Sequence, residues 1–183
     1  CKQMHLPLQS GSSRLLKIMN RHYDKEQYLT LVDKLRAAIP GIGISTDIIV
    51  GFPGETDEQF EDTITLYEHC EYDLAYTFIY SPRAGTPAAK MEDDIDIHTK
   101  EQRLYRLNDL VNEKALKQNQ KYLDEVVEVL VEGTSKKDDN MLTGYTRHQK
   151  LINFKGNQDH IGQIVPVKVT EVKTWALKGE EIE

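Results

Sequence analysis

Residues 44–56 read Ile44-Ser45-Thr46-Asp47-Ile48-Ile49-Val50-Gly51-Phe52-Pro53-Gly54-Glu55-Thr56, and they shape the predicted fold more than any other segment. An alternating strand runs there into a glycine-rich turn and the start of a helix. The even-numbered positions from 42 to 50 are apolar except Thr46, whereas the odd-numbered side carries Ser45 and Asp47 beside Ile49 and two glycines. One face therefore suits a layer of helices and the other a wet cavity.

The opening segment has the same unusual polarity. Its apolar side carries Met4, Leu6 and Leu8, and the other side carries Gln3, His5, Pro7 and Gln9. Parallel strands that helices cover on both faces are near-continuous apolar runs, so this alternation favours a barrel whose lumen holds a ligand. An antiparallel sheet with one face in water is the alternative, and the helical segments between the strands argue against it.

The pattern from residue 1 to about 118 predicts three β/α units. Asp24 is suited to cap a helix that ends before Pro40, and Thr56 with Gln59 forms a capping box for the next helix. The remaining expected elements are a strand over 74–80, a loop over 81–87, an acidic linker over 92–96, and a long helix that begins at the capping pair Thr99 and Gln102 and ends near Asn119.

Residues 119–183 have the pattern of a small all-β module. A β-branched run over 126–131 precedes an expected polar loop over 133–140, and further strands are expected over 142–146, 151–154 and 164–172. This length and its glycine turns suit a five-stranded barrel of the oligonucleotide-binding kind. An unrelated small β-barrel without a ligand is the alternative. The predicted fold class is therefore α/β plus all-β, with domains at 1–118 and 119–183.

The charge balance does not support nucleic-acid binding driven by bulk charge. The 183 residues include 23 basic and 30 acidic side chains, for a formal net charge of −7. A local cluster of basic and aromatic residues in the β module could still contact RNA, although a solvated edge with ordinary lysines would look the same. That cluster comprises Tyr145, Arg147, His148, Lys150, Phe154 and Lys155.

Cysteine usage and hydropathy indicate a cytoplasmic protein. No apolar run approaches membrane-spanning length, and no signal-peptide layout is present. The two cysteines, Cys1 and Cys70, are too few for a disulfide framework or a four-cysteine metal site, which fits a reducing compartment. We expect no metal ligands in this chain.

Three β/α units do not close a barrel, because the outer strands would leave unpaired backbone groups at their edges. The chain also starts at Cys1, almost inside a strand. We therefore expect a fragment of a longer protein. The longer protein is expected to be a monomer, and the fragment to self-associate through its exposed strand edges.

Four motifs in order resemble the radical S-adenosylmethionine methylthiotransferases. They are His5-Leu6-Pro7-Leu8-Gln9-Ser10-Gly11-Ser12, Met19-Asn20-Arg21, residues 45–56, and Tyr80-Ser81-Pro82-Arg83-Ala84-Gly85-Thr86-Pro87-Ala88-Ala89. The Ser-Thr-Asp and Ser-Pro-Arg triplets resemble the branch that adds a methylthio group to isopentenyl-adenosine beside the tRNA anticodon. One alternative is a methylthiotransferase that acts on threonylcarbamoyl-adenosine tRNA or on a ribosomal protein. The other is a non-catalytic RNA-binding module.

The resemblance implies an architecture and a division of labour. Residues 1–118 would form the C-terminal three β/α units of a partial barrel, and 119–183 a TRAM domain that engages the tRNA anticodon stem-loop. The family holds two 4Fe–4S clusters with cysteine motifs that do not occur in this sequence. The implied reaction is reductive cleavage of S-adenosylmethionine, hydrogen abstraction, sulfur insertion and methyl transfer, and the hard chemistry belongs to the cofactors. We therefore expect this chain to be catalytically silent alone.

The resemblance also implies S-adenosylmethionine contacts at Gln9 on a strand end, Arg21 on the following helix and Asp47 on the next strand. An arginine fork can pair with the methionine carboxylate, and a carboxylate in the lumen can accept hydrogen bonds from ribose hydroxyls. Alternatively, Asp47 and Arg21 only pair with each other. The further implied cofactor neighbours are Ser10, Ser12, Ser45, Ile49, Gly51, Phe52, Tyr80 and Arg83.

The turn after the second strand departs from the superfamily pattern, Gly-x-Ile-x-Gly-x-x-Glu. Asp47 replaces the first glycine, Gly54 stands at the glutamate position, and Glu55 follows one place later. We therefore expect Glu55 to stabilise the N-terminus of the next helix rather than to contact a ligand.

Overall fold

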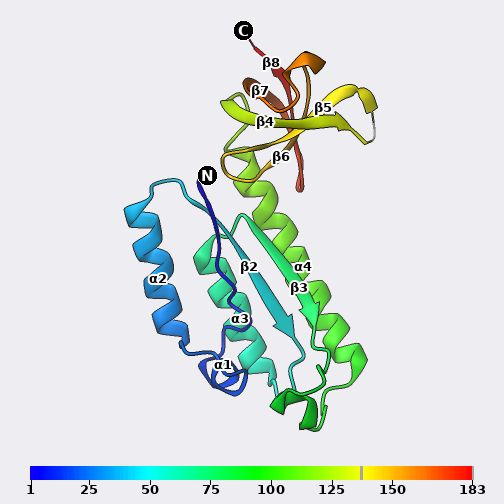
Figure 1. The fold of residues 1–183 in the computed structure, drawn as a ribbon. Coiled ribbons are helices and arrows are strands. Elements are labelled where there is room, and N and C mark those ends of the chain that lie inside the picture. Colours follow the sequence, from blue (N-terminus) through cyan, green and yellow to red (C-terminus); the bar gives the residue numbers. More distant parts are fainter. Residues whose placement is uncertain (137, 183) are drawn as a thin grey trace. The chain divides into compact units, whose positions relative to one another are not determined.

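The protein is described by a computed structural model that covers residues 1–136 and 138–182 (Figure 1). It divides into two compact units, residues 5–111 and residues 1–4 with 112–183. The division falls within helix α4 (Ile97–Gln120), which runs through the expected domain boundary. No helix within the described ranges combines the length and apolarity that crossing a bilayer requires.

The first unit contains the predicted β/α units. A three-stranded sheet has the order β1-β2-β3, formed by β1 (Gln3–His5), of which only His5 falls in this unit, β2 (Gly43–Val50) and β3 (Leu74–Ile79). The helical elements of this part are α1 (Ser13–Ile18), α2 (Lys25–Ala38), α3 (Asp57–Cys70), the 3-10 helix η1 (Pro87–Lys90) and the start of α4. Strands β2 and β3 pair in parallel, so the prediction of an α/β arrangement is confirmed.

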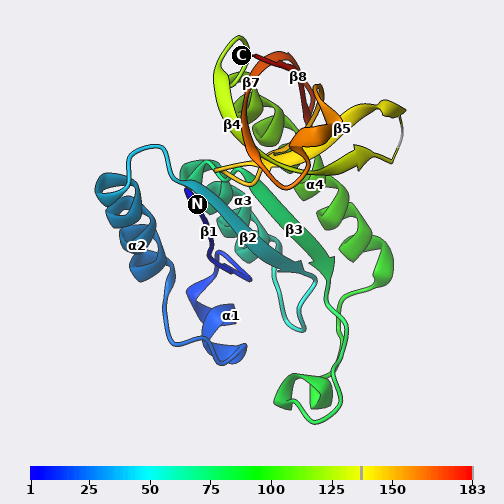
Figure 2. The same cartoon turned by 45° about the horizontal axis from the view of Figure 1, so that its top comes forward.

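Helices cover one face of this sheet. The even-numbered side chains Ile44, Ile48 and Val50 of β2 are fully buried. They share a hydrophobic core with side chains of α2, α3 and α4, and both ribbon views show α3 behind β2 (Figures 1 and 2). The period-two pattern of β2 thus selects the face that the helices cover, as the sequence predicts.

Local side-chain caps define where the helices begin. The capping boxes at Asp24 with Gln27 and at Thr56 with Gln59 are both complete, which confirms the two predicted helix starts. The expected start at Thr99 is wrong, because α4 begins at Ile97. The carboxylate of Asp96 accepts a hydrogen bond from the Thr99 amide at 3.0 Å, and an aspartate is a better cap than a threonine.

The second unit contains the predicted five-stranded barrel, closed in the order β4-β5-β6-β8-β7 (Figure 2). Its inward side chains, among them Val129, Ile152 and Val167, form a separate hydrophobic core. The elements are β4 (Val126–Ser135), β5 (Asp138–Thr146), β6 (Leu151–Lys155), η2 (Gln158–His160), β7 (Ile164–Val172) and β8 (Leu177–Glu181).

Two details of the barrel differ from the prediction. The expected polar loop over 133–140 is wrong for most of its described residues, since β4 continues to Ser135 and β5 begins at Asp138. Register shifts after Val131 and Thr134 let the hairpin extend through polar residues. The fifth strand, β8, was not located by sequence, because it is short and rich in charge.

Candidate functional site

The face of the sheet opposite the helices carries polar and aromatic side chains. Asp47 lies in register with Tyr76 and Ile49 with Phe78 across the parallel pair β2 and β3. Tyr76 is 51% exposed and Phe78 is 50% exposed, which is unusual for large aromatic residues on a strand. We call this side, with Ser45, Asp47, Ile49, Tyr76 and Phe78, the open face.

His5 links two members of the open face. Its Nδ1 atom lies 3.0 Å from the Ser45 hydroxyl, and its Nε2 atom lies 3.4 Å from an Asp47 carboxylate oxygen. Its ring also meets Tyr76 edge-on, with ring centroids 6.2 Å apart. The alternation of the first segment predicts that His5 lies on this side of its strand, and this was the sequence signal for its contact with Ser45 and Asp47.

The alternative in which Asp47 pairs with Arg21 is not what the structure shows. Asp47 pairs with His5, and Arg21 is exposed in the segment between α1 and α2. The prediction that Arg21 lies on the helix is wrong, because α1 ends at Ile18 and Asn20 has a left-handed backbone (φ +60°).

Gln9 has a strained backbone beside Asp47. Its φ of +71° is uncommon for a residue other than glycine, and such residues concentrate at functional sites. The Gln9 amide donates to the Asp47 carbonyl at 2.8 Å, and the Ile49 amide donates to the Gln9 carbonyl at 2.9 Å. These bonds bring Gln9 to the strand position expected from the sequence, next to Asp47 and Ile49.

Ser10 and Ser12 serve the start of α1. Both are buried; the Ser10 hydroxyl accepts a hydrogen bond from the Ser12 amide at 3.2 Å, and Ser12 caps the helix. Between them, the Gly11 amide donates to the Thr63 hydroxyl of α3 at 2.9 Å. These hydrogen bonds give both serines a role in the local fold, and their contact with a cofactor stays a prediction.

The turn after β2 is packed against the loop after β3. The Phe52 ring is buried and meets the Tyr80 ring edge-on, with centroids 5.0 Å apart. The Tyr80 hydroxyl is buried and has no hydrogen-bond partner among the described residues. Arg83 is exposed in the following loop, where its carbonyl oxygen accepts from Thr86. Phe52 and Tyr80 thus come together, whereas Arg83 is exposed three residues further along the loop that Tyr80 begins.

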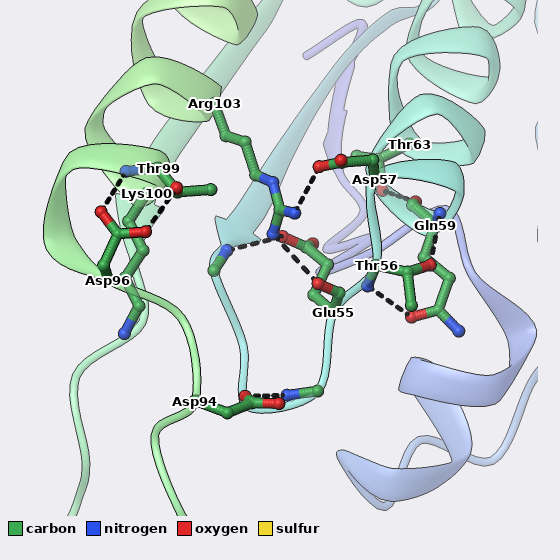
Figure 3. Close-up of polar contacts among 12 residues, drawn as sticks. Glu55, Thr56, Asp57, Gln59, Thr63, Asp94, Asp96, Thr99, Lys100 and Arg103 are labelled. Carbon is green, nitrogen blue, oxygen red and sulfur yellow. Dashed lines mark hydrogen bonds and ion pairs between the residues drawn. The ribbon is translucent and has the colours of Figure 1, made fainter.

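Glu55 closes this turn and pairs with a helix far along the chain (Figure 3). One carboxylate oxygen accepts hydrogen bonds from the Gly51 amide and from Arg103 of α4, each at 2.8 Å. Burial raises the pKa of Glu55, and the Gly51 hydrogen bond and the Arg103 charge oppose that rise. Glu55 thus has a partner, Arg103, that no sequence signal identified, and its expected stabilisation of the helix N-terminus stays a prediction.

The predicted RNA cluster is only partly exposed. Arg147 is exposed and pairs with Glu128, and Lys155 is exposed with its Nζ atom 3.5 Å from Glu180. Phe154 is fully buried in the barrel core and has no free ring face for a base, so its predicted RNA contact is corrected. The other three members are Tyr145 on β5, half-buried; His148, whose ring meets Tyr122 edge-on; and Lys150, which is buried.

The described residues do not bring together three histidine, cysteine, aspartate or glutamate side chains that could hold a metal ion. Cys1 is exposed and Cys70 is buried, and burial raises the pKa of the Cys70 thiol.

Comparisons with known proteins divide the chain into two matched segments. Residues 1–67 match the Radical SAM superfamily, and residues 120–182 match the TRAM domain. A solved structure, the Escherichia coli coproporphyrinogen III oxidase described as a radical SAM enzyme, superposes with a TM-score of 0.53 at 14% identity. The superposition covers 99% of this chain and 45% of the oxidase chain. At 14% identity this similarity shows the fold alone.

Curated relatives match over nearly the whole chain. The tRNA-2-methylthio-N(6)-dimethylallyladenosine synthases of Anoxybacillus flavithermus and Bacillus cytotoxicus are each 58% identical over 182 residues. The synthase of Bacillus subtilis is 57% identical over 179 residues. The matches cover 100%, 100% and 98% of this chain but 34%, 36% and 35% of the relatives. The chain therefore spans about a third of the length of the curated relatives it matches.

Proposed function

We propose that this chain belongs to the radical SAM methylthiotransferases and that it forms part of an enzyme that adds a 2-methylthio group to N6-dimethylallyladenosine in tRNA. The observation that carries this proposal is identity of 57–58% to synthases named for that product, over both the β/α units and the barrel. The modified adenosine would be the isopentenyl-adenosine beside the anticodon, and the enzyme would work in the cytoplasm.

The open face fits S-adenosylmethionine by the chemistry of its groups. The Asp47 carboxylate is partly exposed and can accept hydrogen bonds from ribose hydroxyls. Ile49 offers an apolar surface beside it, and the buried Tyr80 hydroxyl has an unused hydrogen-bonding capacity among the described residues. We propose Gln9, Arg21, Ser45, Asp47, Ile49 and Tyr80 as the cofactor-facing set, with Gly51 and Phe52 shaping the turn beside it.

When bound, S-adenosylmethionine and an iron–sulfur cluster supply the radical chemistry, and this chain supplies binding and orientation. His5 of β1 contacts the Asp47 carboxylate through its Nε2 atom and helps to hold it in place. Its Nδ1 atom is hydrogen-bonded to the Ser45 hydroxyl. Arg21 is exposed and offers a guanidinium fork for the methionine carboxylate. We propose two 4Fe–4S clusters in the full-length protein, with cysteine ligands beyond this chain.

The TRAM domain would bind the tRNA anticodon stem-loop. Exposed Arg147 and Lys155 suit phosphate contacts, and the half-buried Tyr145 and His148 suit contacts to sugars or bases. Lys150 is buried and would act only through its neighbours. The full-length protein would be monomeric, whereas β1 and β3 at the sheet edges could let the isolated chain self-associate.

The direct test uses the full-length protein with reconstituted clusters, S-adenosylmethionine and a sulfur source. Mass spectrometry of nucleosides from a tRNA that carries N6-dimethylallyladenosine should show the methylthio product. Asp47→Ala should weaken S-adenosylmethionine binding by about tenfold or more, because it removes hydrogen bonds to a charged group. A product found only with threonylcarbamoyl-adenosine tRNA or a ribosomal protein would replace the proposed substrate, and no methylthio product with any of them would refute the proposal.

A further inference from the structure

We propose that Arg103 of α4 is a positioning residue for the turn Gly51–Glu55, and that it acts through the Glu55 carboxylate. This inference deepens the proposed function and rests on it, because the turn directly follows the strand that carries Asp47 and Ile49. Figure 3 shows Arg103 reaching from α4 to the turn. We call this set of contacts the Arg103 clamp.

The clamp joins both ends of the turn to one guanidinium. Arg103 donates to the Glu55 carboxylate at 2.8 Å and to the Glu55 carbonyl at 3.1 Å. The same carboxylate oxygen accepts from the Gly51 amide at 2.8 Å, and the Glu55 amide donates to the Phe52 carbonyl at 2.9 Å. A second guanidinium nitrogen donates to Asp57 in the first turn of α3 at 2.7 Å. The Gly51 amide is therefore linked to α4 through the Glu55 carboxylate and the Arg103 guanidinium.

Because Arg103 and Glu55 are both buried, the loss of either side chain should destabilise the turn. The side chains of Arg103 and Glu55 are 8% and 1% exposed. A buried ion pair contributes little more to stability than packed apolar residues would, but the loss of one partner leaves a buried charge without compensation. Without Arg103, the Glu55 carboxylate would have to take up a proton or turn toward water, and the Gly51 amide would lose a charged acceptor.

The turn needs external contacts because its backbone is permissive. Gly51 and Gly54 have left-handed backbones, with φ of +69° and +75°, and glycine populates many alternatives at similar energy. At the Gly54 end, the Asp94 carboxylate accepts a hydrogen bond from the Gly54 amide at 2.8 Å, and Arg14 donates a hydrogen bond to the Gly54 carbonyl at 3.1 Å. The Gly51 end, which follows the open-face strand, is held by the Arg103 clamp.

Arg106 provides a matched control on the same helix. The guanidinium carbons of Arg103 and Arg106 lie 5.8 and 5.6 Å from the centroid of the Phe60 ring. Arg106, however, pairs with Glu61 at the surface, where both side chains are about half exposed. Arg106→Met therefore removes a guanidinium from the same ring and leaves the turn Gly51–Glu55 untouched.

Hydrogen exchange of the Gly51 amide tests the clamp in this 183-residue chain without any cofactor. Arg103→Met should lower the protection of that amide by about tenfold, the effect of losing one hydrogen bond to a charged group. Arg106→Met should leave it unchanged, and Arg103→Lys should restore part of it. Unchanged Gly51 protection in Arg103→Met would overturn the proposal. If that variant does not fold, Glu55→Gln/Arg103→Met removes the uncompensated charge and should show the same loss, and normal protection there would overturn it as well.

The functional arm uses the full-length protein. Arg103→Met should weaken S-adenosylmethionine binding by about tenfold and raise KM for it more than it lowers kcat, whereas Arg106→Met should change neither. Unchanged affinity together with lost Gly51 protection would overturn the positioning role. Wild-type protein that does not bind S-adenosylmethionine would refute the proposed function instead, and the exchange experiment would still decide whether the clamp exists.

Discussion

The aliphatic stem of Lys100 lies where residue 51 would carry a Cβ atom. A Cβ built on Gly51 would come within 2.4 Å of the Lys100 Cγ atom. Lys100 cannot easily move away, because it is buried and its ammonium group lies 2.5 and 2.6 Å from the two Asp93 carboxylate oxygens. Glycine is therefore required at position 51 both for its left-handed backbone and for the space that α4 takes beside it.

Gly51→Ala should destabilise the chain by about 2–4 kcal/mol, which combines the cost of a left-handed alanine with that of overpacking. Urea denaturation followed by circular dichroism measures the loss. Gly41→Ala is the matched control, because Gly41 is also left-handed (φ +76°) but has no atom within 4 Å of its built Cβ. The control should lose only about 1–2 kcal/mol. Equal losses would show that Lys100 does not restrict residue 51.

The two arginines of α4 should differ sharply in their effect on stability. Arg103→Met should cost about 3–5 kcal/mol, because it leaves the Glu55 carboxylate buried and unpaired. Arg106→Met should cost at most about 1 kcal/mol, since its ion pair with Glu61 is exposed. Glu55→Gln/Arg103→Met should be more stable than Arg103→Met alone, and additive losses in this double-mutant cycle would contradict the coupling.

The Glu55 carboxyl should give stability a measurable pH dependence. Its pKa is raised in the folded chain, so between the unfolded and folded values the folded state binds the proton more tightly. The contribution of this group is therefore fully present below its ordinary pKa of 4.5 and is lost as the pH rises through the folded value. Urea midpoints measured from pH 4 upward should fall for the wild type relative to Glu55→Gln. A rise, or parallel curves, would contradict the sign of the shift.

The sequence predicts features that depend on residues close together in the chain, and it does not predict contacts between distant segments. The strand at residues 43–50 follows from alternation, and the helix starts at Asp24 and Thr56 follow from caps that span four residues. Arg103 and Glu55 lie 48 residues apart, and neither local pattern nor spacing predicts that α4 meets the turn. The alternation also predicts that His5 and Asp47 lie on the same side of their strands, but it does not predict that they contact each other.

The barrel shows the same limit for a strand. Residues 177–181, Leu-Lys-Gly-Glu-Glu, have neither the β-branched composition nor the alternation that identified the other four strands. Tertiary pairing defines this strand, since β8 pairs in parallel with β6 and antiparallel with β7. Phe154 was misassigned for a related reason, because an aromatic residue among lysines looks the same in sequence whether its ring points into the core or outward.

Gly179→Ala should open the barrel at β8. A Cβ on Gly179 would lie 2.4 Å from the Lys168 carbonyl oxygen, and this backbone atom of β7 cannot yield as a flexible side chain would. We expect a loss of at least about 2 kcal/mol. Gly133→Ala is the control in the same barrel, because no atom lies within 4 Å of its built Cβ. Thermal unfolding followed by circular dichroism compares the two, and a stable Gly179→Ala variant would show that β8 can be displaced without loss.

Arg147 and Lys155 should account for part of the salt dependence of tRNA binding. Each is exposed, so Arg147→Ala and Lys155→Ala should each reduce the slope of log affinity against log salt concentration by about one. Glu128→Gln should strengthen binding, because it removes the carboxylate that pairs with Arg147. Fluorescence anisotropy with an anticodon stem-loop measures all three. The exposed Lys17 on α1 supplies the control, and a Lys17→Ala slope equal to that of Arg147→Ala would place the RNA contacts outside the proposed barrel surface.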